Sequence, residues 1–240
     1  MDLKSLEKTI YTRRSYRRYK KGGIGEEKRE LIMAAVASLR PLFPEIKYAV
    51  KLFDRSEVRT IMPWMPEDAV AVWSEEGEGA LLNVGFILEQ LDLYIQSIGL
   101  GSCWVGLARP KSGEGCPEGM SFMMLLAVGE PIDQPRSGVF DFKRKSLEDI
   151  SDTASPMLEP ARLAPSSVNS QPWYFSAIDG GFDVYMQRLV RTKGLKRMNK
   201  IDVGIALAHI YVSRPDSFSA FVREDGWGRE DMDYLISILV

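Results

Sequence analysis

The chain has 240 residues, of which 45% are hydrophobic and 27% are charged, as is ordinary for a soluble globular protein. Its formal net charge of −2 gives no general reason to expect nucleic acid or a membrane surface as a partner, and no apolar run approaches the roughly 20 residues that a membrane span needs. Two cysteines provide no disulfide framework, and the charged N-terminus lacks an apolar signal core, so we expect a cytoplasmic protein.

The pattern of apolar residues predicts helices and short strands in an order that repeats along the chain. In the first part we expect helices at 3–12, 26–39 and 79–98, strands at 46–53, 68–73 and 121–128, and a basic connecting segment at 140–150. In the remainder we expect helices at 157–164 and 200–212 and strands at 173–178, 182–187 and 217–223. The helix at 79–98 is apolar on most sides, which indicates a buried central position.

Two short matches indicate that the two parts of the chain are related. The stretch that ends at Pro41 resembles the one that ends at Pro165, 124 positions later. The stretch around Gly85 resembles the one around Gly204, 119 positions later. Similar spacings at two places predict an internal duplication, with a first half at 1–150 and a shorter second half at 151–240.

Two basic clusters are candidates for binding phosphate. Arg13-Arg14-Ser15-Tyr16-Arg17 places three guanidinium groups and a hydroxyl within five residues, and Lys143-Arg144-Lys145 lies in the basic connecting segment. Guanidinium groups match phosphate oxygens with paired hydrogen bonds, and a serine hydroxyl adds a short donor. Taken alone, each cluster fits a solvated surface stretch better than a phosphate site.

A glycine-containing segment, Gly99-Leu100-Gly101-Ser102-Cys103-Trp104-Val105-Gly106, follows the long helix. A dinucleotide fingerprint needs a preceding strand and Gly-x-Gly-x-x-Gly spacing, and both are missing, so we reject a Rossmann site. A helix end followed by a buried strand is the structural alternative.

A polar loop, Pro165-Ser166-Ser167-Val168-Asn169-Ser170-Gln171-Pro172-Trp173, precedes an expected strand. Its proline, serines and asparagine favour a turn in which hydroxyls and an amide point at a ligand. An ordinary turn before a strand is the alternative.

Together these motifs resemble those of the nitroreductase family of FMN-dependent oxidoreductases. The resemblance implies an α+β fold, an α/β/α sandwich of mixed, mainly antiparallel sheets, with long helices packed centrally. It implies that FMN is bound by Arg13, Arg14, Ser15, Arg17, Arg144 and Lys145 at the phosphate, by Cys103, Trp104, Val105 and Gly106 along the ring, and by Pro165, Ser166, Ser167, Asn169 and Gln171 over the ring and ribityl chain. Backbone N–H groups near Val105 and Gly106 would face the N5/O4 edge of the ring. For Cys103 a buried apolar role is the alternative.

The spacing of the motifs departs from the family pattern, because about 150 residues separate the arginine motif from the Pro-Ser-Ser loop. In family dimers these two elements come from different subunits. Here the first half has Leu42-Phe43-Pro44 where its own Pro-Ser-Ser loop would stand, and the second half has neither an arginine motif nor a glycine segment. The retained parts are complementary, so we expect a monomer that acts as an internal pseudodimer and binds one FMN.

The resemblance further implies ping-pong chemistry, in which NADH or NADPH gives hydride to flavin N5 and a small conjugated acceptor, such as a nitroaromatic or a quinone, takes the electrons. The cofactor carries such chemistry, so we expect no catalytic side chain and no metal site. Two alternatives stay open: a non-catalytic protein that stores or senses FMN, and a flavin-free structural module.

Two further features carry less information. His209 is the single histidine and lies in an apolar helix, so we expect a packing role for it. The loop at 62–66 is apolar and fits either a substrate lid or packed surface.

Overall fold

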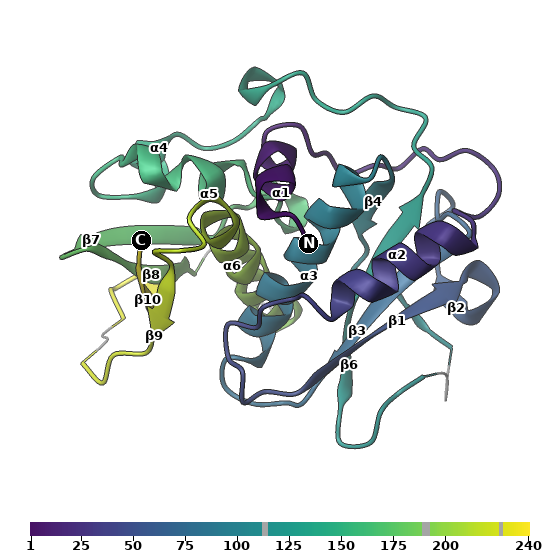
Figure 1. Ribbon diagram of the computed structural model, residues 1–240. Helices are drawn as coiled ribbons and strands as arrows, with labels where there is room; N and C mark the ends of the chain where they lie inside the picture. Colours follow the sequence, from purple (N-terminus) through teal and green to yellow (C-terminus); the bar gives the residue numbers. More distant parts are fainter. Residues whose placement is uncertain (112–114, 189–192, 226–227) are drawn as a thin grey trace.

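The computed structural model describes residues 1–111, 115–188, 193–225 and 228–240, and Figure 1 shows how their helices and strands are arranged. None of the helices in these ranges is both long enough and apolar enough to cross a membrane.

The first part of the chain forms a four-stranded antiparallel sheet, a two-stranded ribbon and four helices. The helices are α1 (Leu3–Ile10), α2 (Glu26–Val36), α3 (Ala80–Ser97) and α4 (Leu147–Ile150). The strands are β1 (Tyr48–Asp54), β2 (Val58–Thr60), β3 (Asp68–Ser74), β4 (Gly101–Trp104), β5 (Ala108–Pro110) and β6 (Ser121–Gly129). Four strands form a sheet in the order β1-β3-β6-β4, while β2 and β5 pair in a separate ribbon.

The second part forms another antiparallel sheet. Its helices are α5 (Glu159–Leu163) and α6 (Lys193–Ser213), and its strands are β7 (Trp173–Ile178), β8 (Gly181–Gln187), β9 (Ser219–Phe221) and β10 (Met232–Leu239). The strand order is β7-β8-β10-β9. The two four-stranded sheets thus have the same strand order. In each sheet the first two strands along the chain are neighbours, and the fourth strand along the chain lies between the second and the third.

Helices α3 and α6 lie against each other between the two sheets (Figure 1). Both are rich in buried apolar residues, and a helix that is apolar on most sides needs cover all around. The two backbones touch at glycines. A Cβ at Gly85 would lie 2.0 Å from the carbonyl oxygen of Ile201, and one at Gly204 would lie 2.1 Å from that of Leu82. No larger side chain fits at either crossing point.

The order of layers is sheet, helices, sheet, so the expected α/β/α sandwich is wrong in its layering, although the helices are central as expected. One apolar core fills the space between the sheets, from Leu6 in α1 to Ile238 in β10. A smaller cluster on the outer face of the first sheet includes Trp73 and Leu125. The β5 strand and the loop at 62–66 cover that face in place of a helix.

Most predicted elements are present with ends shifted by a few residues. Helix α6 begins at Lys193 rather than at 200, and the glycine segment contains strand β4. The expectation that 217–223 is the last strand is wrong, because β10 follows it and inserts between β8 and β9.

Candidate functional site

A pocket of about 170 Å³, named the ring pocket from here on, lies where the two parts of the chain meet. One wall comes from β4, β6 and the arginine segment, and the other from the loop after α5 and from α6. Its lining residues are Ser15, Arg17, Cys103, Trp104, Gly106, Met124, Pro165, Ser166, Ser167, Val168, Met198, Ile201, Asp202 and Ile205. The wall combines apolar and sulfur-containing side chains with five polar or charged residues, as suits a flat organic ligand that carries polar groups.

A second hollow, of about 470 Å³, adjoins the ring pocket and shares five lining residues with it. This basic hollow is lined by Arg14, Ser15, Arg17, Arg136, Asp141, Lys143, Arg144, Pro165, Ser166, Val168 and Asn169. These described lining residues include four arginines and a lysine but a single carboxylate. Such an excess of guanidinium groups suits a phosphate group, whose oxygens they bind in pairs.

Phe142 holds two of these arginines in place. The guanidinium carbon of Arg136 lies 4.2 Å from the centre of the Phe142 ring, and that of Arg144 lies 5.6 Å from it. Burial, followed by the positive charges of Arg13 and other nearby arginines, lowers the pKa of Arg136 to about 10 and that of Arg144 to about 9. The cluster thus carries uncompensated positive charge, which a bound anion would relieve.

The arginine segment runs beside β4. Ser15 forms a parallel bridge with Ser102, and the Tyr16 N–H donates to the Ser102 carbonyl oxygen at 3.0 Å. Arg13 turns into the core instead of the hollow. It is 1% exposed, and its Nη2 donates to Asp92 Oδ2 at 3.0 Å. Its charge is neutralised inside the protein, so Arg13 is a structural cation.

The Pro-Ser-Ser loop is fixed by its own hydrogen bonds and by α6. The Ser167 N–H donates to both carboxylate oxygens of Asp202, at 3.0 and 3.1 Å. The Gln171 N–H donates to Ser166 Oγ at 2.9 Å. Val168, Asn169 and Gln171 have φ values of 48°, 58° and 47°, in the left-handed region that costs non-glycine residues energy. Strain of about 1–3 kcal/mol per residue of this kind is typical of ligand-binding loops.

The basic connecting segment is tied to this loop. Arg144 Nη1 donates to Asn169 Oδ1 at 2.8 Å, and Arg144 Nε donates to the Ala164 carbonyl oxygen at 3.0 Å. Lys145 Nζ donates to the Gln171 carbonyl oxygen at 3.1 Å, and the Lys145 N–H donates to Gln171 Oε1 at 2.7 Å. Lys145 and Gln171 therefore join two binding segments to each other and lie behind the hollow.

The structure brings together most of the predicted site residues. Eleven line the ring pocket or the basic hollow: Arg14, Ser15, Arg17, Cys103, Trp104, Gly106, Arg144, Pro165, Ser166, Ser167 and Asn169. Arg13, Lys145 and Gln171 lie behind these walls, as described above. Val105 is buried, and its N–H donates to the Leu125 carbonyl oxygen at 2.8 Å, so that N–H is engaged within the sheet.

Several lining residues carry no motif and were missed from the sequence. Arg136 lies in an irregular segment, and Met124, Met198, Ile201 and Ile205 look like ordinary core residues of a strand and a helix. Asp202 could have been recognised from the sequence as a candidate site residue, because a carboxylate is unusual inside an apolar helix. Burial raises the pKa of Asp202 to about 7.

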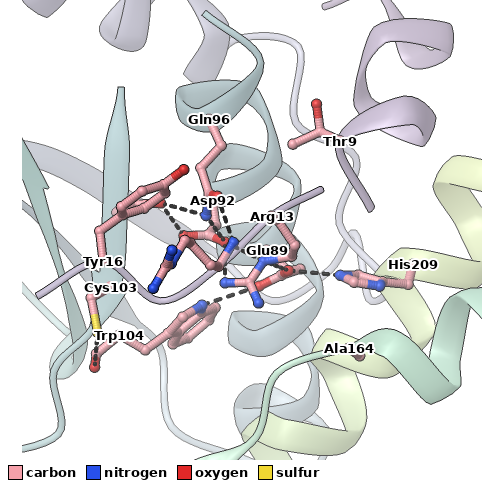
Figure 2. Close-up of polar contacts among 12 residues, drawn as sticks. Thr9, Arg13, Tyr16, Glu89, Asp92, Gln96, Cys103, Trp104, Ala164 and His209 are labelled. Carbon is pink, nitrogen blue, oxygen red and sulfur yellow. Dashed lines mark hydrogen bonds and ion pairs between the residues drawn. The ribbon is translucent and has the colours of Figure 1, made fainter. Parts of the chain in front are cut away.

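A buried polar network lies directly behind the ring pocket (Figure 2). Trp104, which lines the pocket, donates from Nε1 to Glu89 Oε2 at 3.1 Å. Glu89 Oε1 lies 2.8 Å from Nε2 of His209 and 3.5 Å from Nε of Arg13. Burial raises the pKa of Glu89 to about 7 and that of Asp92 to about 6. His209 is buried and hydrogen-bonded at both ring nitrogens, which fits the packing role expected for it.

The α+β fold, with two antiparallel sheets about a central helix pair, is nitroreductase-like. Residues 5–214 match a protein-family model described as "Putative TM nitroreductase", and because this match spans most of the sequence, the chain belongs to that nitroreductase family.

Comparison with a solved structure gives the same fold. A Thermotoga maritima protein described as a "putative nitroreductase" superposes with a TM-score of 0.66 at 18% identity, over 98% of this chain and 93% of that chain. A nitroreductase with bound FMN from Desulfitobacterium hafniense gives a TM-score of 0.44 at 15% identity, over 57% of this chain and 95% of that chain. Comparison with curated proteins gives no match.

Proposed function

We propose that the protein is an FMN-dependent NAD(P)H oxidoreductase that binds one FMN per chain. The observation that carries the proposal is the junction of the ring pocket with the basic hollow, through the shared residues Ser15, Arg17, Pro165, Ser166 and Val168. FMN has the corresponding two parts, a flat ring system and a phosphate at the end of a short chain. Membership of a nitroreductase family supports the same cofactor.

The donors present fit this cofactor. Arg14, Arg17, Arg136 and Arg144 would hold the phosphate, with Ser15 and Ser166 as hydroxyl donors beside it. Trp104, Met198 and Ile205 would enclose the ring and keep water from it. Bound there, FMN would supply the redox chemistry, taking hydride from NADH or NADPH and passing electrons to a nitroaromatic, a quinone or a similar small acceptor by a ping-pong route. The chain's own residues would bind and orient, with no acid or base required of them.

We also propose that residues 1–150 and 151–240 are two halves derived from one ancestral unit, so that a single chain does the work of a dimer. The shared strand order of the two sheets supports this. So does the reciprocal contact at the helix crossing, because Gly85 meets Ile201 while Gly204 meets Leu82, and both pairs are related by the same spacing of 119. Reciprocal contacts of this kind are typical of two-fold interfaces.

A second reciprocal pair supports the same proposal. Asn83 Oδ1 accepts from the N–H groups of Leu42 and Phe43, at 2.8 and 3.1 Å, as Asp202 accepts from Ser167. The hollow beside Phe43 has a volume of about 510 Å³, and its described charged lining residues are Glu45, Glu78, Asp233 and Lys200. Three carboxylates beside one lysine would repel a phosphate group, so this hollow is unsuited to FMN. Its composition therefore supports one FMN site per chain.

The test is a cofactor count followed by reduction. Purified protein saturated with FMN and then desalted should retain one FMN per chain, measured by absorbance near 450 nm against protein concentration. Anaerobic NADPH or NADH should then bleach that absorbance, and added acceptor should restore it. Protein that retains no FMN would overturn the proposal, whereas yellow protein that neither reductant bleaches would leave FMN storage or sensing as the function.

A further inference from the structure

A third hollow, of about 760 Å³, adjoins the ring pocket on the side away from the basic hollow. It shares Gly106 and Met198 with the ring pocket and extends over the β2–β5 ribbon. We name it the outer arginine hollow, after Arg59, Arg109 and Arg197 in its wall. A molecule whose reacting end lies where the two hollows meet, beside Gly106 and Met198, could therefore place its other end against these arginines.

The pairing of the ribbon puts two of these charges face to face. Arg59 and Arg109 are register partners across β2 and β5, and both are exposed. Like charges directly opposite each other destabilise a strand pair, so this arrangement weakens the ribbon unless an anion lies between them. Neither guanidinium group makes an ion pair or a hydrogen bond with another residue that the structure describes. Glu76 is the single carboxylate among the described lining residues.

The third arginine is anchored, and apolar surface lies beside all three. Arg197 Nη2 contacts Met123 Sδ at 2.9 Å, at the start of β6. Ile61 is 77% exposed and Leu107 is 64% exposed, and both line the hollow. Exposed aliphatic side chains next to guanidinium groups suit a ligand with both a flat apolar part and an anionic part, because guanidinium planes also stack on aromatic rings.

We propose that the outer arginine hollow binds the phosphate groups of a nicotinamide dinucleotide whose reacting ring lies where this hollow meets the ring pocket, beside Gly106 and Met198. The inference rests on the proposed reductase function for its biological meaning. The shared chemistry is a phosphate group, and its source is either the 2′-phosphate, which NADPH alone carries, or the diphosphate, which both dinucleotides carry.

The first test measures binding without turnover. Adenosine 2′,5′-bisphosphate and ADP are titrated by calorimetry into the protein, with FMN and without it, at two salt concentrations. At least one nucleotide should bind, more weakly at high salt, and Arg59→Gln combined with Arg109→Gln should raise its Kd at least tenfold. Binding of the bisphosphate alone identifies the 2′-phosphate as the source. Binding of ADP alone, or equal binding of both through the 5′-phosphate that they share, identifies the diphosphate end. Binding of neither, or an unchanged Kd in the variant, overturns the inference.

Controls separate the site from general charge and from folding. Lys47→Gln removes one positive charge outside the outer arginine hollow and should leave nucleotide binding unchanged. Arg59→Glu places opposite charges across the ribbon, so it should keep or raise the melting temperature while weakening nucleotide binding further. In the reductase assay Arg109→Gln should raise the KM for the dinucleotide tenfold and change kcat less than twofold. Failure of FMN binding would overturn the proposed function. The titration of FMN-free protein would still show whether the outer arginine hollow binds a nucleotide.

Discussion

Glu89 Oε1 and His209 Nε2 lie 2.8 Å apart, and both side chains are fully buried. Nδ1 of His209 lies 2.8 Å from the carbonyl oxygen of Pro160, which only accepts, so Nδ1 carries a proton. Burial lowers the pKa of His209 to about 3, so its ring is neutral and Nε2 is an acceptor. The proton between the two side chains therefore belongs to Glu89, whose pKa is raised by burial to about 7.

A pH-dependent stability follows from this buried acid. The folded protein keeps the Glu89 proton up to about pH 7, whereas the unfolded chain releases it near the ordinary value of 4.5. The stabilisation from Glu89 is thus complete below pH 4.5 and is lost as the pH rises to about 7. Glu89→Gln, which mimics the protonated acid, should gain stability relative to the wild type over this interval, by at most about 1.4 kcal/mol per pH unit. Urea unfolding at pH 4.5 to 8 measures the difference, and parallel profiles for the two proteins would contradict the assignment of the proton.

The arginine motif should contribute directly to cofactor affinity. Arg17 lines both the ring pocket and the basic hollow, and Arg17→Ala should weaken FMN binding by about 1.5–3 kcal/mol, the range for losing a charge-assisted hydrogen bond. Quenching of FMN fluorescence measures the Kd. Arg18→Ala is the matched control, because Arg18 pairs with Asp133 at 3.0 Å on the surface. Equal losses in the two variants would show a general effect of charge.

The helix crossing should tolerate no added side chain. Gly85→Ala and Gly204→Ala each bring a Cβ to about 2 Å from a backbone carbonyl oxygen, which cannot move aside as a side chain would. We expect each to lower the free energy of unfolding by about 3 kcal/mol or more. Gly194→Ala in α6 meets no atom of the described residues within 4 Å and should stabilise the helix by up to about 1 kcal/mol. Thermal or urea unfolding measures the stability of the three variants. Equal stability of all three would contradict the close contact between the two helix backbones.

We expect Asp202 to affect FMN binding through the Pro-Ser-Ser loop, because its carboxylate accepts from the Ser167 N–H in that loop. Asp202→Asn keeps an acceptor for the Ser167 N–H and removes a carboxyl group whose pKa burial raises to about 7, so we expect FMN affinity close to that of the wild type. Asp202→Ala leaves that N–H without its partner, at a cost of about 1–3 kcal/mol, and should weaken FMN binding by a similar amount. Titrating FMN into both variants checks this. Equal affinity in the alanine variant would show that the loop keeps its shape without Asp202.

The sequence predicted what local patterns determine. The apolar run of α3, its glycine end and the Pro-Ser-Ser loop all appear near their expected places, because each depends on neighbouring residues. The position of Arg13 could not be predicted in this way, since it depends on Asp92, which is 79 residues away in the sequence. Arg136 was missed for the same reason, because its side chain reaches the basic hollow from a segment without a motif.

Two misses concern the arrangement of elements. Strand β10 contains the apolar residues Leu235, Ile236, Ile238 and Leu239. A search for residues that alternate between apolar and polar does not distinguish this run from an irregular chain end, so the strand was missed. The layering could not be predicted because nothing in the local pattern says that the β2–β5 ribbon and the 62–66 loop cover the outer face of the first sheet.

The pairing of α3 with α6 has a consequence for how such a protein can change. In a dimer of identical chains every contact across the axis occurs twice, and one substitution alters both sides. On the proposed duplication, the two helices of this chain vary separately. His209 stands where α3 has Gln90, and its partner Glu89 stands where α6 has Ala208. One buried acid–imidazole contact thus exists once per molecule, an asymmetry that selection could reach only after the two copies were joined.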